Sequence, residues 1–221
     1  MKKFLKIAGI GCGSLIGLFL IIGVIGAIFS SDSETETTAE NSETTIKVVD
    51  SLEIKRQQKV KDSLALIAKA KREKAEKDLS SFKKKEDEFE GNTFYRDPRT
   101  PYYTNVNFIY PYIGQKDNDY WLRLKFQYAA DDWLFINSGI LLVDGEKYTI
   151  SGNWERDNNS GIWEWLDIPV RDTERLILER IANSKSAKIR YVGTQYHNDR
   201  TITNKEKSII KKTLEIYDNL K

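Results

Sequence analysis

The stretch at residues 193–203, GTQYHNDRTIT, holds the side chains best suited to acid–base chemistry. It contains the only histidine of the chain, His197, with Tyr196 before it and Arg200 shortly after. A histidine can act as a general base near neutral pH, and an arginine can hold an anionic substrate. Asp199 is close to His197 only because it is two residues away, and the Asn-Asp dipeptide there is typical of turns. We therefore interpret the stretch as a turn and keep Tyr196, His197 and Arg200 as candidate binding residues.

No motif supplies the nucleophile or phosphate loop that an enzyme of a familiar class would need. The chain has no GxSxG, no phosphate-binding GxxxxGK[ST] and no GxGxxG. One cysteine, Cys12, and one histidine exclude a disulfide framework within the chain and a Cys- or His-based zinc cluster. Asp131 and Asp132 are adjacent, so on a strand they would point to opposite faces and form a poor catalytic pair. We predict no catalytic residue, no metal ligand and no cofactor, although a calcium or magnesium site made of oxygen ligands stays open.

Aromatic side chains with charged neighbours form the second group of candidates. In IWEWLDIPV, Trp163 and Trp165 share one strand face with Asp167. Trp121 and Arg123 share the polar face of another strand. Partly exposed aromatic rings of this kind are typical of binding surfaces for sugars, peptides or proteins. The other interpretation is that these tryptophans pack beneath helices or against the proline-rich loop before the first long strand.

The elements that must position these residues belong to the C-terminal part, where all five tryptophans and all eleven tyrosines occur. Residues 120–128, YWLRLKFQY, alternate between apolar and polar side chains, which predicts a half-buried strand. Asp144-Gly145 predicts a hairpin turn. Thr203 and Glu206 form a capping box that opens an amphipathic last helix. We expect strands at residues 105–113, 120–128, 133–136, 140–143, 147–151, 162–168 and 187–194, a helix at 173–182, and hence an α+β fold with an antiparallel sheet.

Pro111 and Asp172 add two finer predictions. A proline within a strand favours the edge of a sheet, so we place the strand at residues 105–113 there. Asp172 is a suitable N-cap for the helix at 173–182.

The N-terminal part predicts a membrane anchor. Residues 7–29 carry no charge, and a helix needs about 20 apolar residues to cross a bilayer. Lysines precede this stretch and an acidic segment follows it, so we expect the N-terminus inside and the C-terminal domain outside the cytoplasmic membrane. Two alternatives stay open, namely a secretory signal cleaved near residues 25–27 and a lipoprotein processed at Cys12.

Glycines within the predicted span suggest self-association. Gly9, Gly13 and Gly17 are four residues apart, so they lie on one face of a helix. Small residues at this spacing allow two membrane helices to approach closely.

A linker and a stalk connect the anchor to the C-terminal domain. Residues 30–45 are acidic and rich in Ser and Thr, which predicts a flexible tether. Residues 46–90 are rich in strong helix formers and contain neither Gly nor Pro, which predicts a charged helical stalk. Val60, Leu64 and Ile67 keep a coiled-coil spacing, but charged residues break the seam after them.

The composition completes the expected organisation. Basic and acidic residues, 35 and 33 in number, leave a net charge of +2, so no overall field favours a nucleic-acid partner. We expect a bacterial envelope protein that presents an extracytoplasmic binding domain for an unknown protein or glycan. An envelope hydrolase acting on cell-wall or glycan material and a structural assembly subunit are the alternatives. The expected parts are a cytoplasmic tail (1–6), a transmembrane helix (7–29), a linker (30–45), a stalk (46–90) and an α+β domain (91–221).

Overall fold

The computed structural model describes residues 42–159 and 161–221 of the chain. The chain divides between Glu53 and Ile54 into two compact units, and only residues 42–53 of the first unit are described. The second unit begins within the long helix α1 (Ser42–Ser80) and contains all the other described helices and strands.

No helix in the described part of the chain is both long enough and apolar enough to cross a membrane. α1 is 39 residues long, but lysine, arginine and glutamate side chains follow one another along it. α2 (Asp172–Asn183) and α3 (Asn204–Leu220) are shorter than the about 20 residues that a bilayer requires. This finding contradicts the predicted transmembrane helix, and with it the predicted single-pass protein of the cytoplasmic membrane with an extracytoplasmic C-terminal domain. The predicted span, residues 7–29, lies outside the described residues.

Two more predictions concern the beginning of the chain. The proposed self-association face of Gly9, Gly13 and Gly17 lies outside the described residues. Of the predicted linker, residues 30–45, the part up to residue 41 also lies outside the described residues. Its last residues, from 42 on, belong to α1.

Within the second unit, α1 is exposed along most of its length and buried only near its end. The predicted coiled-coil positions Val60, Leu64 and Ile67 are all more than half exposed. Ala75 and Leu79, by contrast, are buried in the main core. The end of α1 is therefore a part of the folded domain.

α1 ends at Ser80, well before the predicted end of the stalk. The residues after it form the hairpin of β1 (Lys83–Asp87) and β2 (Asn92–Arg96). Phe82 is buried just before β1 and joins the main core. The lysine-rich segment favours a helix by its own propensity, but pairing with β2 overrides this preference.

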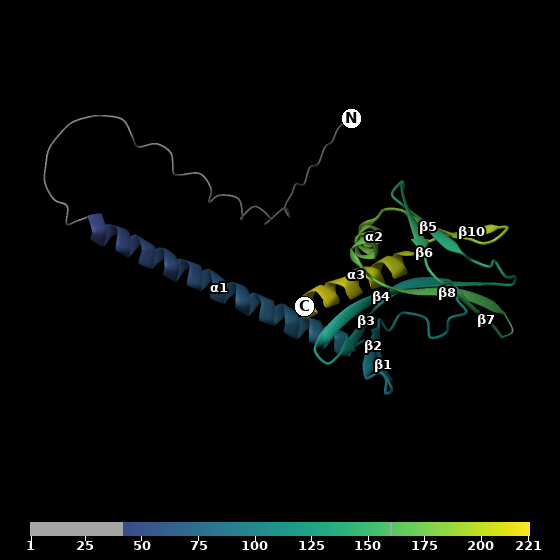
Figure 1. The fold of residues 1–221 in the computed structure, drawn as a ribbon, viewed down its shortest axis with the longest axis horizontal. Helices are drawn as coiled ribbons and strands as arrows, with labels where there is room; N and C mark the ends of the chain where they lie inside the picture. Colours follow the sequence, from purple (N-terminus) through teal and green to yellow (C-terminus); the bar gives the residue numbers. More distant parts are fainter. Residues whose placement is uncertain (1–41, 160) are drawn as a thin grey trace, which may run out of the picture. The chain divides into compact units, whose positions relative to one another are not determined.

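Two antiparallel sheets confirm the predicted α+β class (Figure 1). The larger sheet has the order β1-β2-β3-β4-β8-β7, with β3 (Phe108–Lys116), β4 (Asp119–Ala130), β7 (Glu155–Asn158) and β8 (Ile162–Pro169). The smaller sheet has the order β10-β9-β5-β6, with β5 (Ser138–Val143), β6 (Glu146–Ser151), β9 (Ala187–Val192) and β10 (His197–Thr201). The predicted turn at Asp144-Gly145 joins β5 to β6, and both residues have positive φ angles, 48° and 97°.

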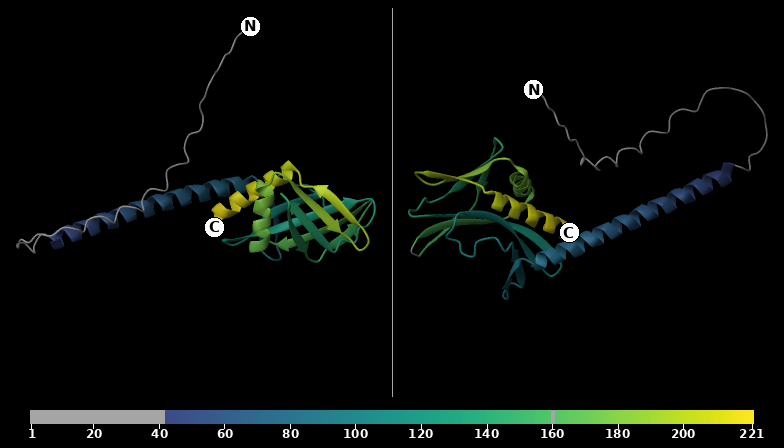
Figure 2. Two further views of the ribbon diagram at one scale, coloured as in Figure 1. Left: turned by 90° about the horizontal axis from the view of Figure 1, so that it is seen from above. Right: turned by 180° about the vertical axis from the view of Figure 1, so that it is seen from behind.

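The main core lies between the two sheets and the helices. The predicted alternation in β4 is confirmed, since Leu122, Leu124 and Phe126 are almost fully buried. Tyr128 of the larger sheet contacts Tyr191 of the smaller one, with ring centroids 5.2 Å apart. Figures 1 and 2 show α3 beside the larger sheet, with α2 next to α3. The opposite side of the larger sheet, which carries Trp121, Arg123 and their neighbours in register, is called the outer face below.

Pro111 lies inside the larger sheet, because β3 pairs with β4 on one side and with β2 on the other. The prediction of an edge strand is therefore wrong for β3 as a whole. It holds locally, because β2 pairs only with residues 113–115 of β3. Ile109 is two residues before Pro111, so the backbone nitrogens of both residues point to the same side of the strand. The N–H of Ile109 donates to the carboxylate of Glu206 in α3 at 2.8 Å. Pro111 thus lies at a position that does not pair with β2, so no hydrogen bond is lost through its missing N–H.

A buried carboxylate takes the place of the strand predicted at residues 133–136. The backbone N–H groups of Leu134, Phe135 and Ile136 all donate to the carboxylate of Glu164, at 2.9, 2.9 and 2.7 Å. Phe135 has a positive φ of 54°, which turns the three N–H groups toward one point. Arg156 adds an ion pair with Glu164 at 3.2 Å. Since these donors are used by Glu164, they cannot form a strand ladder.

The predicted N-cap residue is confirmed for α3 and is wrong for α2. Thr203 caps α3 as predicted, because its hydroxyl accepts from the N–H of Glu206 while its own N–H donates to the Glu206 carboxylate at 2.8 Å. In α2 the cap is Arg171 and not Asp172. The N–H of Arg171 donates to the Glu174 carboxylate at 2.9 Å, so the acidic side chain of the first turn satisfies the helix start from within.

Candidate functional site

The candidate residues from the sequence fall into two groups on different sheets. Trp121 and Arg123 share one face of β4, and Trp163 and Trp165 share one face of β8, as their alternation predicts. The register of β4 with β8 brings both pairs to the outer face of the larger sheet. Tyr196, His197 and Arg200 belong to the β9–β10 hairpin of the smaller sheet. The structure therefore does not bring the two groups together in one site.

The segment around His197 is a strand, so the predicted turn is wrong except at its beginning. His197 opens β10, lies opposite Val192 and is exposed. Asp199 forms two hydrogen bonds with Arg190 of β9, both 2.7 Å long. The hydrogen bonds and positive charge of Arg190 hold the pKa of Asp199 below its ordinary value. Asp199 thus serves the pairing of β9 with β10.

Arg200 has a structural partner in the first turn of α3. Its guanidinium donates to the buried carboxylate of Glu206 at 2.6 and 3.1 Å. Burial by itself raises the pKa of Glu206, but the hydrogen bonds and charge of Arg200, with those of Thr203, outweigh it and hold the pKa below its ordinary value. This ion pair ties β10 to α3 and to β3, because Glu206 also accepts the N–H of Ile109. Arg200 is therefore engaged within the fold.

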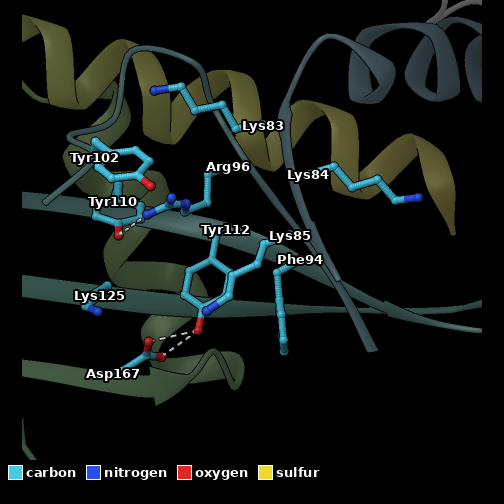
Figure 3. Close-up of a pocket in the computed structure, with 10 residues that line it drawn as sticks. All are labelled: Lys83, Lys84, Lys85, Phe94, Arg96, Tyr102, Tyr110, Tyr112, Lys125 and Asp167. Atoms are coloured by element: carbon cyan, nitrogen blue, oxygen red, sulfur yellow. Dashed lines mark hydrogen bonds between the residues drawn. The ribbon is translucent and has the colours of Figure 1, made fainter. Parts of the chain in front are cut away.

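The outer face of the larger sheet carries a groove with a cavity volume of about 800 Å³ (Figure 3). Strand register explains how it forms: Lys85 lies opposite Phe94, Tyr110 lies opposite Lys125, and Lys125 lies opposite Asp167. Side chains at directly opposite positions point to the same face. The lining combines five cations, four aromatic rings and one carboxylate, namely Lys83, Lys84, Lys85, Arg96, Lys125, Phe94, Tyr102, Tyr110, Tyr112 and Asp167.

A hydrogen-bonded triad of Tyr112, Arg123 and Asp167 lies at one side of the groove. The Tyr112 hydroxyl donates to Asp167 at 2.8 Å, and Figure 3 shows it pointing directly at the carboxylate. The Arg123 Nε lies 2.8 Å from Asp167 Oδ1 and 2.9 Å from the Tyr112 hydroxyl oxygen. Burial, followed by the charge of Asp167, raises the pKa of Tyr112, so this hydroxyl stays protonated. Arg123 therefore forms an ion pair with Asp167, the carboxylate among the residues that line the groove.

Four of the lining cations form no ion pair with a described residue. Lys84 pairs with Glu86. Lys83, Lys85, Arg96 and Lys125 have no ion-pair partner among residues 53–159 and 161–221, whose side chains the structure describes. Arg96 instead approaches the Tyr110 hydroxyl at 3.5 Å, and Lys83 approaches the Thr100 carbonyl at 3.4 Å. The groove thus holds a local excess of positive charge.

Lys125 is half-buried, whereas Lys83 and Lys85 are exposed. Its Nζ lies 5.7 Å from the centroid of the Trp165 ring, which gives it a cation–π contact. Burial is the main cause that lowers the pKa of Lys125, and it outweighs the attraction of Asp167. A desolvated ammonium group of this kind gains free energy when an anion approaches.

Aromatic rings form the rest of the groove and its border. Trp121 lies flat against Gly114, where a Cβ atom would be only 2.2 Å from its Cε2 atom, so residue 114 must be glycine for the indole to lie there. Phe94 meets the Trp121 ring edge to face at 6.3 Å. Tyr102 lines the groove from the loop after β2 and is 74 % exposed. Its neighbour Tyr103 is 69 % exposed and does not line the groove.

The loop that carries Tyr102 is held by a buried carboxylate. Asp97 is fully buried and accepts from the backbone N–H and the guanidinium of Arg99 at 2.8 to 2.9 Å. Burial alone raises the pKa of Asp97, but the hydrogen bonds and charge of Arg99 outweigh it and lower the pKa. Arg99 also donates to the Ser208 hydroxyl of α3 at 2.9 Å. The proline-rich loop is therefore fixed to the domain on the side of the groove.

Most of the groove residues were missed in the sequence, although two signals were present. Tyr110 and Tyr112 are two residues apart, so they share a strand face. Lys125 and Asp167 alternate with the core residues, as Arg123 and Trp165 do. Lys83 and Lys85 had no such signal, because their segment reads as helix.

The groove can bind and orient a charged ligand, and its own residues offer little for bond breaking. Its carboxylate is paired with Arg123, and no histidine or cysteine lines it. Among the described residues no group of three or more His, Cys, Asp or Glu side chains could hold a metal ion. Comparison of the chain with known protein families, with curated proteins and with solved structures finds no match.

Proposed function

We propose that this chain is a binding protein and that its ligand is an anion held in the groove on the outer face of the larger sheet. The observation that carries this proposal is a set of four cations around one concave surface that form no ion pair with the described residues, namely Lys83, Lys85, Arg96 and Lys125.

The distribution of charge in the rest of the domain supports the proposal. Acidic residues are nearly as numerous as basic ones, and ten of the other described lysines and arginines take part in ion pairs, namely Lys69, Arg72, Lys74, Lys84, Arg99, Arg123, Arg156, Arg175, Arg190 and Arg200. Other lysines also form no ion pair, but the four cations of the groove differ from them because they line one concave surface together. Like charges that gather without counter-charges repel one another and lower the stability of the fold. A low-dielectric wall beside such a cluster focuses its field and attracts anions.

Lys125 adds a second reason. Its ammonium group is partly desolvated, and this lowers its pKa. A bound anion would stabilise the charged form of Lys125 and so recover part of the lost hydration. The unliganded groove is therefore less favourable electrostatically than the liganded one.

The test is isothermal titration calorimetry of the full chain with inorganic tripolyphosphate at low salt. Lys85→Gln combined with Arg96→Gln should weaken binding roughly tenfold, because both charges face the groove. Lys147→Gln combined with Lys188→Gln is the matched control, since these exposed lysines lie on the smaller sheet. The control should change the affinity less than about twofold. Equal losses in both double variants would show that binding follows the net charge and would overturn the proposal.

A further inference from the structure

The carboxylate of Asp167 indicates a property of the ligand other than negative charge. Asp167 lines the groove, and its side chain is 19 % exposed. Its Oδ1 atom accepts from Arg123 and Tyr112, whereas its Oδ2 atom accepts only from the Tyr112 hydroxyl. A carboxylate offers about four acceptor positions, so Asp167 keeps acceptor capacity on the Oδ2 side.

The groove therefore combines two opposite demands on a ligand. The cations Lys85, Arg96 and Lys125 attract negative groups, while Asp167 needs a hydrogen-bond donor and repels negative groups. A ligand that carries only anions meets the first demand and not the second. A ligand that carries hydroxyl donors close to its anionic groups meets both.

The aromatic rings add a third demand. Phe94, Tyr102 and Tyr112 line the same groove as these cations. The faces of aromatic rings carry partial negative charge and pack well on C–H groups, which carry partial positive charge. Sugar rings present such C–H faces together with hydroxyl groups along their edges.

From these three demands we propose that the anionic ligand is an acidic oligosaccharide, a sugar chain whose units carry carboxylate, sulfate or phosphate groups. This inference rests on the proposed function of the groove. The sugar rings pack against Phe94 and Tyr102, a hydroxyl group donates to Asp167, and the acidic groups pair with the lysines and Arg96. Lys85 lies on β1 and Lys125 on β4, and three strand spacings amount to about 14 Å. This span is longer than one sugar ring, so the ligand is a chain and not a monosaccharide.

The experiment compares, on the full chain, anionic probes with and without sugar hydroxyl groups and one uncharged oligosaccharide. Oligogalacturonate carries carboxylates and a heparin-derived oligosaccharide carries sulfates, so these two probes distinguish the sources of the acidic group. Tripolyphosphate and an oligothymidylate carry anions without sugar hydroxyl donors next to them, and maltohexaose carries hydroxyl groups without charge. We expect at least one acidic oligosaccharide to bind roughly tenfold more tightly than tripolyphosphate, oligothymidylate and maltohexaose.

Two variants test the roles of single side chains. Asp167→Asn should weaken binding of the acidic oligosaccharide roughly tenfold, because a charged acceptor is lost, and should strengthen binding of tripolyphosphate, because a repulsive charge is lost. Tyr102→Ala should weaken the oligosaccharide several-fold, whereas the matched control Tyr196→Ala, in the hairpin of the smaller sheet, should leave it within about twofold. Both tyrosines are exposed, so neither change threatens the fold.

The outcomes separate this inference from the proposed function. If Asp167→Asn strengthens every anionic probe alike, or if oligothymidylate binds as tightly as the oligosaccharides, the ligand is a simple polyanion or a nucleic acid; the inference is then overturned while the anion-binding function stands. If no probe binds in a way that depends on Lys85 and Arg96, both are overturned.

Discussion

Glu164 is the residue whose replacement most directly tests how the domain is held together. Its side chain is fully buried, and its carboxylate accepts three consecutive backbone N–H groups, those of Leu134, Phe135 and Ile136. Glu164→Gln changes the shape of the side chain very little. It replaces one acceptor oxygen by an NH₂ group that can only donate.

The expected loss of stability follows from counting donors and acceptors. Oε1 of Glu164 accepts two of the three N–H groups and Oε2 accepts the third, so the NH₂ group of glutamine faces at least one N–H donor in either orientation. A buried donor without an acceptor costs about 1–3 kcal/mol, and the remaining hydrogen bonds lose their charge assistance. We expect a loss of about 3 kcal/mol in the free energy of unfolding. For a domain of this size this corresponds to a decrease in Tm of about 6–12 °C.

Urea and thermal unfolding of the full chain measure this loss, with Glu146→Gln as the control. Glu146 is exposed on β6, so the same chemical change there should alter the free energy of unfolding by less than about 0.5 kcal/mol. Hydrogen exchange at Leu134, Phe135 and Ile136 should accelerate in Glu164→Gln before global unfolding. A decrease of less than about 1 kcal/mol would show that water or another group serves these N–H donors, and the reasoning would be refuted.

Three other predictions concern the ion pair of α3 and the groove. Because the pKa of Glu206 is lowered in the folded state, its contribution to stability is complete above the unfolded pKa of about 4.3 and is lost as the pH falls through the folded pKa. Glu206→Gln should therefore reduce the free energy of unfolding by about 3 kcal/mol at neutral pH, and this free energy should then decline less steeply toward acid pH. Urea unfolding over a pH series measures both effects. A decline toward acid pH as steep as in the unchanged protein would contradict this. Gly114→Ala should displace Trp121 and reduce stability by about 1–3 kcal/mol, with a red shift in tryptophan fluorescence that an unmoved indole would not show. Because the pKa of Lys125 is lowered, tripolyphosphate binding should weaken as the pH rises through that pKa. Lys125→Arg should retain binding at a higher pH, since arginine stays charged. Parallel pH profiles of affinity for the two proteins would exclude this role of Lys125.

Local patterns predicted those parts of the fold that depend on neighbouring residues. The alternation of Leu122, Leu124 and Phe126 identifies β4 and its core face without knowledge of the partner strands. Thr203 and Glu206 mark the start of α3, because a capping box is complete within four residues of chain. In each case the interacting groups lie close together in the sequence.

The predictions that failed depend on contacts between distant residues. Lys83 and Lys85 favour a helix when taken alone, and only pairing with β2 makes their segment a strand. The apolar residues at 133–136 look like a strand, but Glu164, about 30 residues later, takes up their N–H groups. Neither partner can be identified from local periodicity.

The groove could be predicted in part only. Alternation alone placed Trp121 and Arg123 on one face of their strand and Trp163 and Trp165 on one face of another, and the structure brings both pairs to the outer face of the same sheet. Tyr110 and Asp167 complete the site through the register of β3, β4 and β8, which the sequence does not specify.

Net charge was a poor guide to the charge that a ligand would meet. Basic and acidic residues nearly cancel over the chain, which favours the expectation of no directing field. Strand register decides where the charges lie, because it gathers five cations and one carboxylate around the groove. The local charge of the groove therefore differs from the net charge of the chain. Because Lys83 and Lys85 are exposed and form no ion pair with a described residue, their replacement should alter binding far more than it alters stability.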